Sequence, residues 1–148
     1  TLRKKGIRVE CIYGQTSMDD RQQIVSAFRE GNVDVLITNP HTLAESVSLH
    51  KSCHDAIYFE YSYNLVHLLQ SKDRIHRLGL PDGQYTQYYY LQEQFATDAD
   101  ELFSLDARIL TRLYEKEQTM LNAIETDCLE SATTSQEDLE LIFKGLKL

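Results

Sequence analysis

The 148-residue sequence lacks the long apolar segments that membrane spans and secretion signals require. No apolar run approaches the roughly 18 residues of a spanning helix, and the N-terminal TLRKKGIRV contains no apolar stretch of signal-peptide length. Cysteine is also scarce: Cys11, Cys53 and Cys128 lie far apart and form no C-x-x-C pair. These absences argue against a membrane protein, a disulfide scaffold and a zinc site, and they favour a reducing cytoplasm.

Two further absences concern metal ions and nucleotides. The five histidines form no H-E-x-x-H motif and have no converging carboxylates, so we expect no metal site in this chain. The sequence contains neither a G-x-x-x-x-G-K-[ST] phosphate loop nor a D-E-x-H-like acidic box. We therefore expect the isolated chain to have no ATPase activity, because nothing in it can cradle a β-phosphate or hold magnesium.

The net charge of −8 is unevenly distributed along the chain. Residues 1–94 contain 10 Lys and Arg against 11 Asp and Glu, whereas residues 95–148 contain 5 against 12. The first part is therefore nearly neutral and the last third is strongly acidic. Because residues 1–94 are nearly neutral, they can still carry a local basic face, and phosphate binding requires no more than that. The composition therefore does not exclude a nucleic-acid partner.

Segments typical of strands and helices alternate through the first 94 residues. Apolar runs of strand length and amphipathic helical patterns distinguish the two. The predicted strands are 8–13, 33–38, 55–60 and 85–92, and the predicted helices between them are 19–30 and 64–76. This alternation predicts an α/β fold, a parallel sheet flanked by helices, with functional residues in loops at the carboxyl ends of the strands.

The pattern changes after residue 94. Apolar residues at helical spacing predict a long amphipathic helix over about 98–125, and a polar linker then leads to a short helix over about 135–145. We therefore expect two parts, an α/β domain of residues 1–94 and an acidic helical extension of residues 95–148.

The densest chemical signal is the segment Q-S-K-D-R-I-H-R-L-G of residues 70–79. Arg74 and Arg77 are three residues apart, so they share one face if the helix continues through them. Two guanidinium groups at a helix end suit a triphosphate, because each is permanently charged and offers forked donors to phosphate oxygens. A bare R-x-x-R pair is more often a solvated surface pair than a phosphate-binding one. The neighbouring motifs are therefore needed to distinguish these two interpretations.

These neighbouring motifs resemble those of superfamily 2 helicases. Q-x-x-x-R-I-H-R-L-G is similar to motif VI, and its R-I-H-R form most resembles the Swi/Snf-type DNA translocases. Residues 14–28 resemble the family's segment with a glycine, an arginine and a phenylalanine. Residues 33–40 resemble the strand that enters motif V, and residues 56–70 resemble the segment before motif VI. The resemblance covers residues 1–94, and the tail resembles the long helix that braces the second motor domain in that family.

The resemblance implies that residues 1–94 are an N-terminally truncated RecA-like helicase C-terminal domain of an ATP-dependent DNA translocase or helicase. ATP and Mg²⁺ would be bound mainly by a first RecA-like domain, absent from this chain, and Arg74 and Arg77 would act there as catalytic arginine fingers. Further residues are implied to contact either ATP and the first domain, or the DNA phosphate backbone. The first group comprises Gln70, His76, Glu45, Ser46 and Ser48, and the second comprises Gly14, Gln15, Thr16, Asn39 and His41.

Some residues depart from the family's pattern. The segment that corresponds to motif V, residues 39–49, contains no glycine, although glycines let a backbone approach phosphates closely. The family's W-N-P is Tyr63, Asn64 and Leu65 here. These departures indicate a divergent, prokaryotic or phage-borne branch with a cytoplasmic location, or a nuclear one if the source is eukaryotic. Two alternatives stay open: a non-catalytic helicase-like interaction module, and an RNA helicase domain of the same superfamily.

Overall fold

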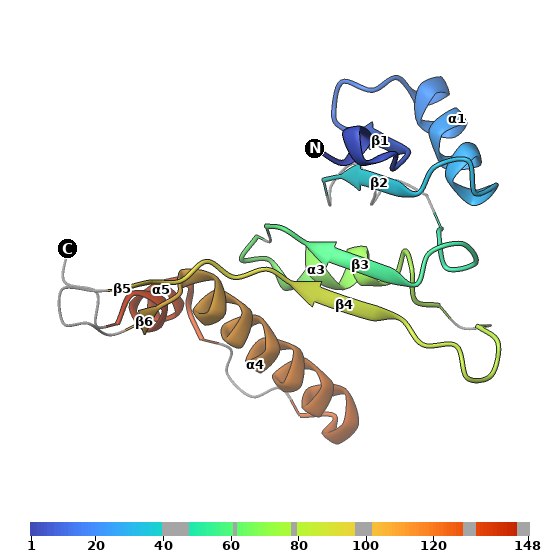
Figure 1. Cartoon of the computed structure of the whole chain (residues 1–148). Helices are drawn as coiled ribbons and strands as arrows, with labels where there is room; N and C mark the ends of the chain where they lie inside the picture. Colours follow the sequence, from blue (N-terminus) through green and yellow to red (C-terminus); the bar gives the residue numbers. More distant parts are fainter. Residues whose placement is uncertain (40–47, 61, 78–79, 97–101, 129–132, 145–148) are drawn as a thin grey trace. The chain divides into compact units, whose positions relative to one another are not determined.

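The structure, a computed structural model, describes residues 1–39, 48–60, 62–77, 80–96, 102–128 and 133–144 (Figure 1). The chain divides into two compact units, which are described separately. The first comprises Thr1–Ile57 with Val66–Tyr89, and the second comprises Tyr58–Leu65 with Tyr90–Leu148. None of the helices in the described ranges has the length and apolar character that crossing a membrane requires.

The first unit begins with a strand–helix–strand segment. A short 3₁₀ helix, η1 (Leu2–Lys5), precedes strand β1 (Val9–Ile12), helix α1 (Met18–Arg29) and strand β2 (Val35–Thr38). Ser17 caps α1 by accepting a hydrogen bond from the Asp20 amide. β1 and β2 pair in parallel, from Val9 opposite Val35 to Ile12 opposite Thr38, so both strands end at the same edge.

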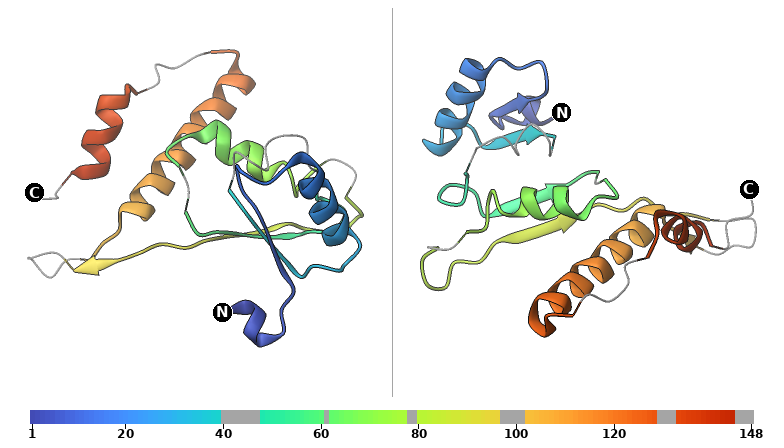
Figure 2. Two further views of the ribbon diagram at one scale, coloured as in Figure 1. Left: turned by 90° about the horizontal axis from the view of Figure 1, so that it is seen from above. Right: turned by 180° about the vertical axis from the view of Figure 1, so that it is seen from behind.

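A second strand–helix–strand segment has the same order. It comprises strand β3 (Asp55–Tyr58), helix α3 (Leu65–Lys72) and strand β4 (Gln87–Tyr90), and β3 pairs with β4. The Gln87 amide donates to the His54 carbonyl, and the Leu91 amide donates to the Tyr58 carbonyl. From the first bond to the second, both strands run the same number of residues in the same direction, so the pair is parallel. The predicted α/β fold of parallel strands flanked by helices is confirmed (Figure 2). The four strands pair two by two.

The core of the first unit joins both segments. Ile12 of β1, Val25 of α1, Leu49 and Ile75 are each at most 5% exposed and form one buried cluster. Ile75 directly follows Arg74 in the chain. Burial of Ile75 therefore fixes the backbone of the segment that carries the predicted arginines.

The second unit contains a short hairpin and two helices. Strands β5 (Phe95–Ala96) and β6 (Leu102–Phe103) pair antiparallel, and helices α4 (Leu105–Thr126) and α5 (Ser135–Phe143) follow. The long helix begins at Leu105 rather than near residue 98, because Ser104 caps it by accepting a hydrogen bond from the Ala107 amide. The short helix lies within the predicted range 135–145 and begins with a capping box between Thr134 and Glu137.

A buried carboxylate fastens α5 to α4. Asp138, 0% exposed, accepts hydrogen bonds from Arg112 Nη2 at 2.7 Å and Thr133 Oγ1 at 2.8 Å. Its second oxygen lies 2.5 Å from Lys116 Nζ. Burial alone would raise the pKa of this carboxyl, but the hydrogen bonds from Arg112 and then from Lys116 outweigh burial and hold the pKa well below its usual range.

Candidate functional site

The helix predicted over 64–76 ends earlier than its periodicity indicates. α3 stops at Lys72, and the amides of Arg74 and Ile75 donate to the carbonyls of Ser71 and Lys72, three residues behind each of them. This tight turn brings Ile75 into the core. The helix does not continue through Arg74 and Arg77, which was the condition for their sharing one face: Arg74 lies in the turn, and Arg77 follows it.

Other parts of the unit hold the backbone of this turn. The Arg74 carbonyl accepts a hydrogen bond from the Leu49 amide at 2.7 Å, and the Lys72 carbonyl accepts one from the Tyr88 hydroxyl at 3.2 Å. Together with the buried Ile75, these bonds fix the turn against β4 and against the segment that contains Leu49. The fold therefore provides a firm base for both arginine side chains.

The two guanidinium groups have no partner in the described part of the chain. Arg74 is half-buried, and its Nε is shielded from solvent yet lacks a hydrogen-bond partner among the described residues. Arg77 is exposed and forms no hydrogen bond or ion pair there. Because a buried donor without an acceptor is unfavourable, an oxygen supplied by a ligand would stabilise Arg74.

Two more predicted residues flank the arginines in the chain. Gln70 is exposed on the last turn of α3, and His76 is exposed between the buried Ile75 and Arg77. The structure therefore places both side chains at the surface of the arginine segment.

The segment around Ser48 also reaches this turn. Its neighbour Leu49 makes the backbone hydrogen bond to the Arg74 carbonyl. The Ser48 carbonyl accepts a hydrogen bond from Arg29 Nη2 at 2.8 Å, and its hydroxyl lies 2.6 Å from His50 Nδ1. Ser48 is thus next to a residue that contacts the arginine segment, whereas Glu45 and Ser46 lie outside the described residues.

A second predicted site begins where β1 ends, in a tight turn over residues 13–16. The Thr16 amide donates to the Tyr13 carbonyl at 2.9 Å, and the Tyr13 amide donates to the Thr16 hydroxyl at 3.1 Å. Gly14 and Gln15 form the exposed tip. The structure therefore brings Gly14, Gln15 and Thr16 together at the carboxyl end of a strand.

Asn39 belongs to the same edge of the sheet. It directly follows β2, and the parallel register places Ile12 opposite Thr38. The turn of residues 13–16 and Asn39 consequently lie at one end of this strand pair, as parallel pairing predicts. His41, the remaining predicted contact, lies outside the described residues.

Arg21 is the arginine of the motif over residues 14–28 but is not among the predicted site residues, and it holds the turn of residues 13–16. Its Nε donates to the Thr16 carbonyl at 2.9 Å, and its Nη2 donates to the Gly14 carbonyl at 3.2 Å. The available signal was spacing, because a long side chain in the first turn of a helix can reach back over the loop before it.

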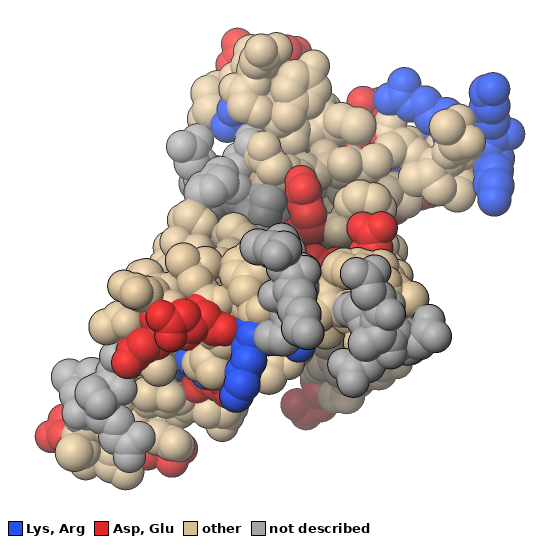
Figure 3. All heavy atoms as spheres, turned by 90° about the vertical axis from the view of Figure 1, so that its left-hand side faces the viewer, with Lys and Arg blue, Asp and Glu red and all other residues tan. Residues whose placement is uncertain are grey.

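The face drawn in Figure 3 carries both basic and acidic side chains of the described residues. Within the described ranges, no three His, Cys, Asp or Glu side chains are placed to hold a metal ion.

Comparison with known proteins gives one family. The model of the helicase conserved C-terminal domain matches residues 1–79, more than half of the chain. No curated protein matches the chain, whereas 79 chains of solved structures do.

Two of these structures are a C-terminal part of an ATPase domain and a C-terminal domain of a DEAD-box protein. The C-terminal part of the Fun30 ATPase domain matches with a TM-score of 0.60 and 18% identity, covering 95% of this chain and 39% of that one. The C-terminal domain of the DEAD-box protein Dbp5 matches with a TM-score of 0.54 and 17% identity, covering 78% of this chain and 59% of that one. The chain thus spans less than two thirds of either structure, and the likeness shows a common fold.

Proposed function

This chain belongs to the helicase conserved C-terminal domain family, and we propose on that premise that it is the second RecA-like domain of a Swi/Snf-type, ATP-driven DNA translocase. In such a motor, ATP lies between two RecA-like domains. The first supplies a phosphate loop and an acidic box for Mg²⁺, and neither occurs in this sequence. The second supplies the residues that complete the ATP site.

The placement of Arg74 and Arg77 carries the proposal. The shielded Nε of Arg74, which has no hydrogen-bond partner among the described residues, and the exposed guanidinium of Arg77 are donors that suit phosphate oxygens. ATP with Mg²⁺ supplies the γ-phosphoryl group, and these arginines would stabilise the negative charge that develops on it during transfer. An arginine in this role contributes about 10³–10⁵ in turnover in other nucleotidases.

The residues around the arginines have supporting roles in this proposal. Gln70 and His76 contact the first domain and link it to the arginine segment. Glu45, Ser46 and Ser48 contact the nucleotide or the first domain. The hydrogen bond between the Leu49 amide and the Arg74 carbonyl supports this assignment, because it joins the segment after Ser48 to the arginine turn.

The nucleic-acid contact is proposed at the shared edge of β1 and β2. Gly14, Gln15 and Thr16 contact phosphates of one strand, together with Asn39 and His41. DNA is preferred to RNA because of the R-I-H-R form of residues 74–77. Closure of the two domains on ATP, and their opening after hydrolysis, would then move the motor along DNA.

Arg77→Lys tests the proposal in the protein that joins this chain to a first motor domain. Lysine keeps the charge but removes the planar fork. We expect turnover to fall by about a thousandfold, while ATP affinity stays within several-fold, because the arginine acts mainly in the transition state. The measurement is steady-state ATP hydrolysis at saturating DNA, with DNA affinity measured without nucleotide.

Arg8→Lys is the matched control, because Arg8 pairs with Asp34 beside the starts of β1 and β2 and has no proposed contact with ATP. It should leave turnover unchanged. Near-normal turnover in Arg77→Lys would contradict the role of Arg77 and transfer it to Arg74. Normal turnover in Arg77→Lys and Arg74→Lys alike would favour a non-catalytic interaction module.

A further inference from the structure

One peptide group, that between Ser48 and Leu49, connects helix α1 with the arginine turn, and we call it the bridging peptide. Its carbonyl, that of Ser48, accepts a hydrogen bond from Arg29 Nη2 at 2.8 Å. Its amide, that of Leu49, donates to the Arg74 carbonyl at 2.7 Å. Arg29 belongs to the last turn of α1, whereas Arg74 lies in the turn after α3. Three segments that are distant in the sequence therefore meet at this peptide.

The geometry of a peptide group makes these two bonds depend on each other. In a trans peptide the carbonyl and the amide N–H point in opposite directions, and no described peptide bond is cis. Arg29 therefore holds one side of the bridging peptide and Arg74 is held on the other, so a rotation of the peptide plane would disturb both bonds. The bonds also reinforce each other, because a carbonyl that accepts from a cation makes the N–H of its own peptide group a stronger donor.

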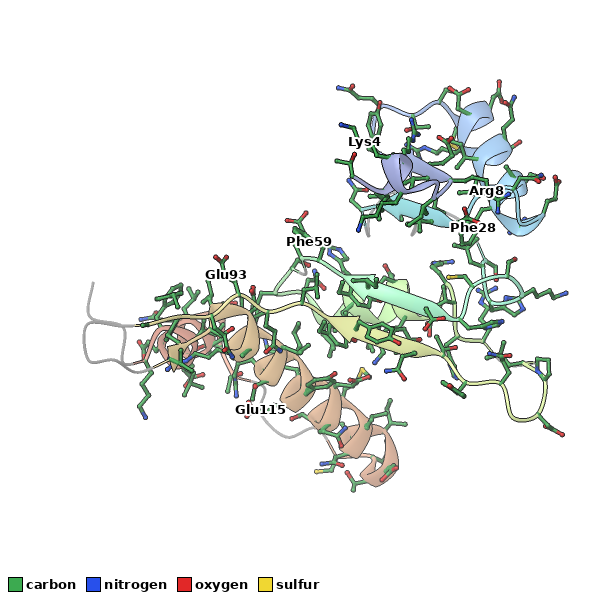
Figure 4. All side chains as sticks on the ribbon, viewed as in Figure 1. Lys4, Arg8, Phe28, Phe59, Glu93 and Glu115 are labelled. Atoms are coloured by element: carbon green, nitrogen blue, oxygen red, sulfur yellow. The ribbon has the colours of Figure 1, made fainter. Side chains whose placement is uncertain are left out.

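Packing brings the same segments together without help from Arg29. Phe28 of α1 packs against the buried cluster that contains Leu49 and Ile75 (Phe28 is labelled in Figure 4). Arg29 is exposed, and within the described residues its guanidinium bonds to the bridging peptide alone. The apolar cluster thus holds α1 and the arginine turn close to each other, and Arg29 adds the orientation of the peptide between them.

We propose that Arg29 is a positioning residue for Arg74. By holding the bridging peptide, Arg29 fixes the backbone from which the Arg74 side chain extends, so that the Arg74 guanidinium meets the phosphate oxygens in one orientation. The inference rests on the proposed function, which makes Arg74 a contact of ATP. Arg29 acts through the backbone and touches neither the nucleotide nor the reacting atoms.

Arg29→Met tests this role in the protein that joins this chain to a first motor domain. Methionine keeps an unbranched apolar stem but cannot donate to the Ser48 carbonyl. We expect kcat for ATP hydrolysis to fall about tenfold, because a small misplacement of a catalytic group is costly. KM for ATP should stay within about twofold, because the positioned arginine acts mainly in the transition state. Arg29→Lys should recover most of the turnover, since its ammonium can still donate to this carbonyl.

Arg3→Met is the matched control. Arg3 is also an exposed arginine that donates to a backbone carbonyl, that of Val9, at 2.6 Å. Val9 begins β1 and is not part of the arginine turn, so Arg3→Met should leave kcat and KM unchanged. Arg3→Met and Arg29→Met should also give similar urea midpoints in the 148-residue chain, because both replace exposed residues.

A double variant separates positioning from a merely structural effect. In an Arg74→Lys background, Arg29→Met should lower kcat by no more than a further factor of about two, because the group that it positions is already replaced. In NMR spectra of the 148-residue chain, the Leu49 amide proton should shift to lower frequency in Arg29→Met, as its bond to Arg74 weakens, and should stay in place in Arg3→Met. Arg29→Gln, whose side chain is shorter, replaces Arg29→Met if that variant does not fold.

Normal kcat in Arg29→Met together with low kcat in Arg74→Lys would overturn the inference and leave the proposed function standing. An equal loss of kcat in the parent and the Arg74→Lys backgrounds would also overturn it, because Arg29 would then act independently of Arg74. The proposed function fails by a different result, which is normal turnover in both Arg74→Lys and Arg77→Lys.

Discussion

Two sets of arginines in this chain are used in opposite ways. On α4, Arg108 and Arg112 donate to other groups of the same unit. After α3, Arg74 in the turn and Arg77 just beyond it have no partner among the described residues. The comparison separates charge that holds the fold from charge that is available to a ligand.

The α4 arginines fasten both ends of α5. Arg108 donates to the carbonyls of Ile142 and Lys144, at the end of α5. Arg112 binds the buried Asp138 near the start of α5 and also pairs with Glu115, which projects from α4 in Figure 4. The hydrogen bond to Asp138 is the main reason that the pKa of Arg112 is raised.

The environment of Arg74 is different in kind. Removing a charged donor from water is unfavourable unless an acceptor replaces the water. The Nε atoms of Arg74 and Arg112 are both shielded and without a hydrogen-bond partner among the described residues. Arg112 nevertheless finds an acceptor in Asp138 through its Nη2, whereas the Arg74 side chain has no hydrogen bond or ion pair to any described residue. This is the condition expected of a group whose acceptor arrives with a ligand.

The largest effect on stability should come from breaking the buried pair. Arg112→Met leaves the fully buried Asp138 with Lys116 as its only cationic partner among the described residues. We expect the free energy of unfolding of the α4–α5 pair to fall by about 3 kcal/mol, because an inadequately compensated buried charge is strongly unfavourable. Hydrogen exchange of the α5 amides measures this change.

Glu115→Gln is the control for that variant. Glu115 is the half-exposed partner of the same arginine, with a side chain that is 52% exposed. Loss of such a surface pair should change stability by no more than about 0.5 kcal/mol. An equal loss of stability in Arg112→Met and Glu115→Gln would show that Arg112 does not stabilise the fold through Asp138.

The four strands of the first 94 residues could be predicted from sequence, whereas the short strands β5 and β6 and the end of α3 could not. The continuous apolar run 33–38 predicted a strand, although the residues of β2 are half-buried or exposed. By contrast, Leu65, Leu68, Leu69 and Ile75 satisfy helical spacing, yet Ile75 reaches the core equally well from a turn. Local periodicity therefore identifies the buried residues here without fixing the backbone that carries them.

The partners of the charged residues were also beyond sequence reasoning. Asp138 stands in the first turn of a helix, where an acidic residue usually faces solvent and the helix dipole. Its burial depends on Arg112, Lys116 and Thr133, and the first two are more than twenty residues away in the chain. The motif resemblance located Arg74 and Arg77, but only the structure shows which arginines already have acceptors.

The buried ion pair of Asp138 also predicts how the stability of the α4–α5 pair depends on pH. Because the folded-state pKa of Asp138 lies below its unfolded value, its contribution is fully present above the unfolded pKa of about 4. As pH falls below that value, protons bind the unfolded state preferentially and the contribution is progressively lost. The exchange of α5 amides should therefore accelerate, relative to its intrinsic rate, as pH falls from about 5 to about 2.

Asp138→Asn should flatten this dependence, because the titrating group is gone. Asp34→Asn serves as the control. The pKa of Asp34 is also lowered, to about 2, by hydrogen bonds from Arg8, but this exposed pair belongs to the first unit. It should leave the α5 amides unaffected. An unchanged pH profile in Asp138→Asn would assign the acid sensitivity of α5 to another group.

The smallest expected effect on stability is that of Arg77→Gln. Arg77 is exposed and unpartnered in the described part of the chain, so its removal should change the free energy of unfolding by less than about 0.5 kcal/mol. Urea denaturation of the 148-residue chain, followed by circular dichroism, measures the change. The same substitution should abolish most ATP turnover in the two-domain motor, because it removes both the charge and the fork. A stability loss comparable with that of Arg112→Met would instead class Arg77 with the structural arginines of α4.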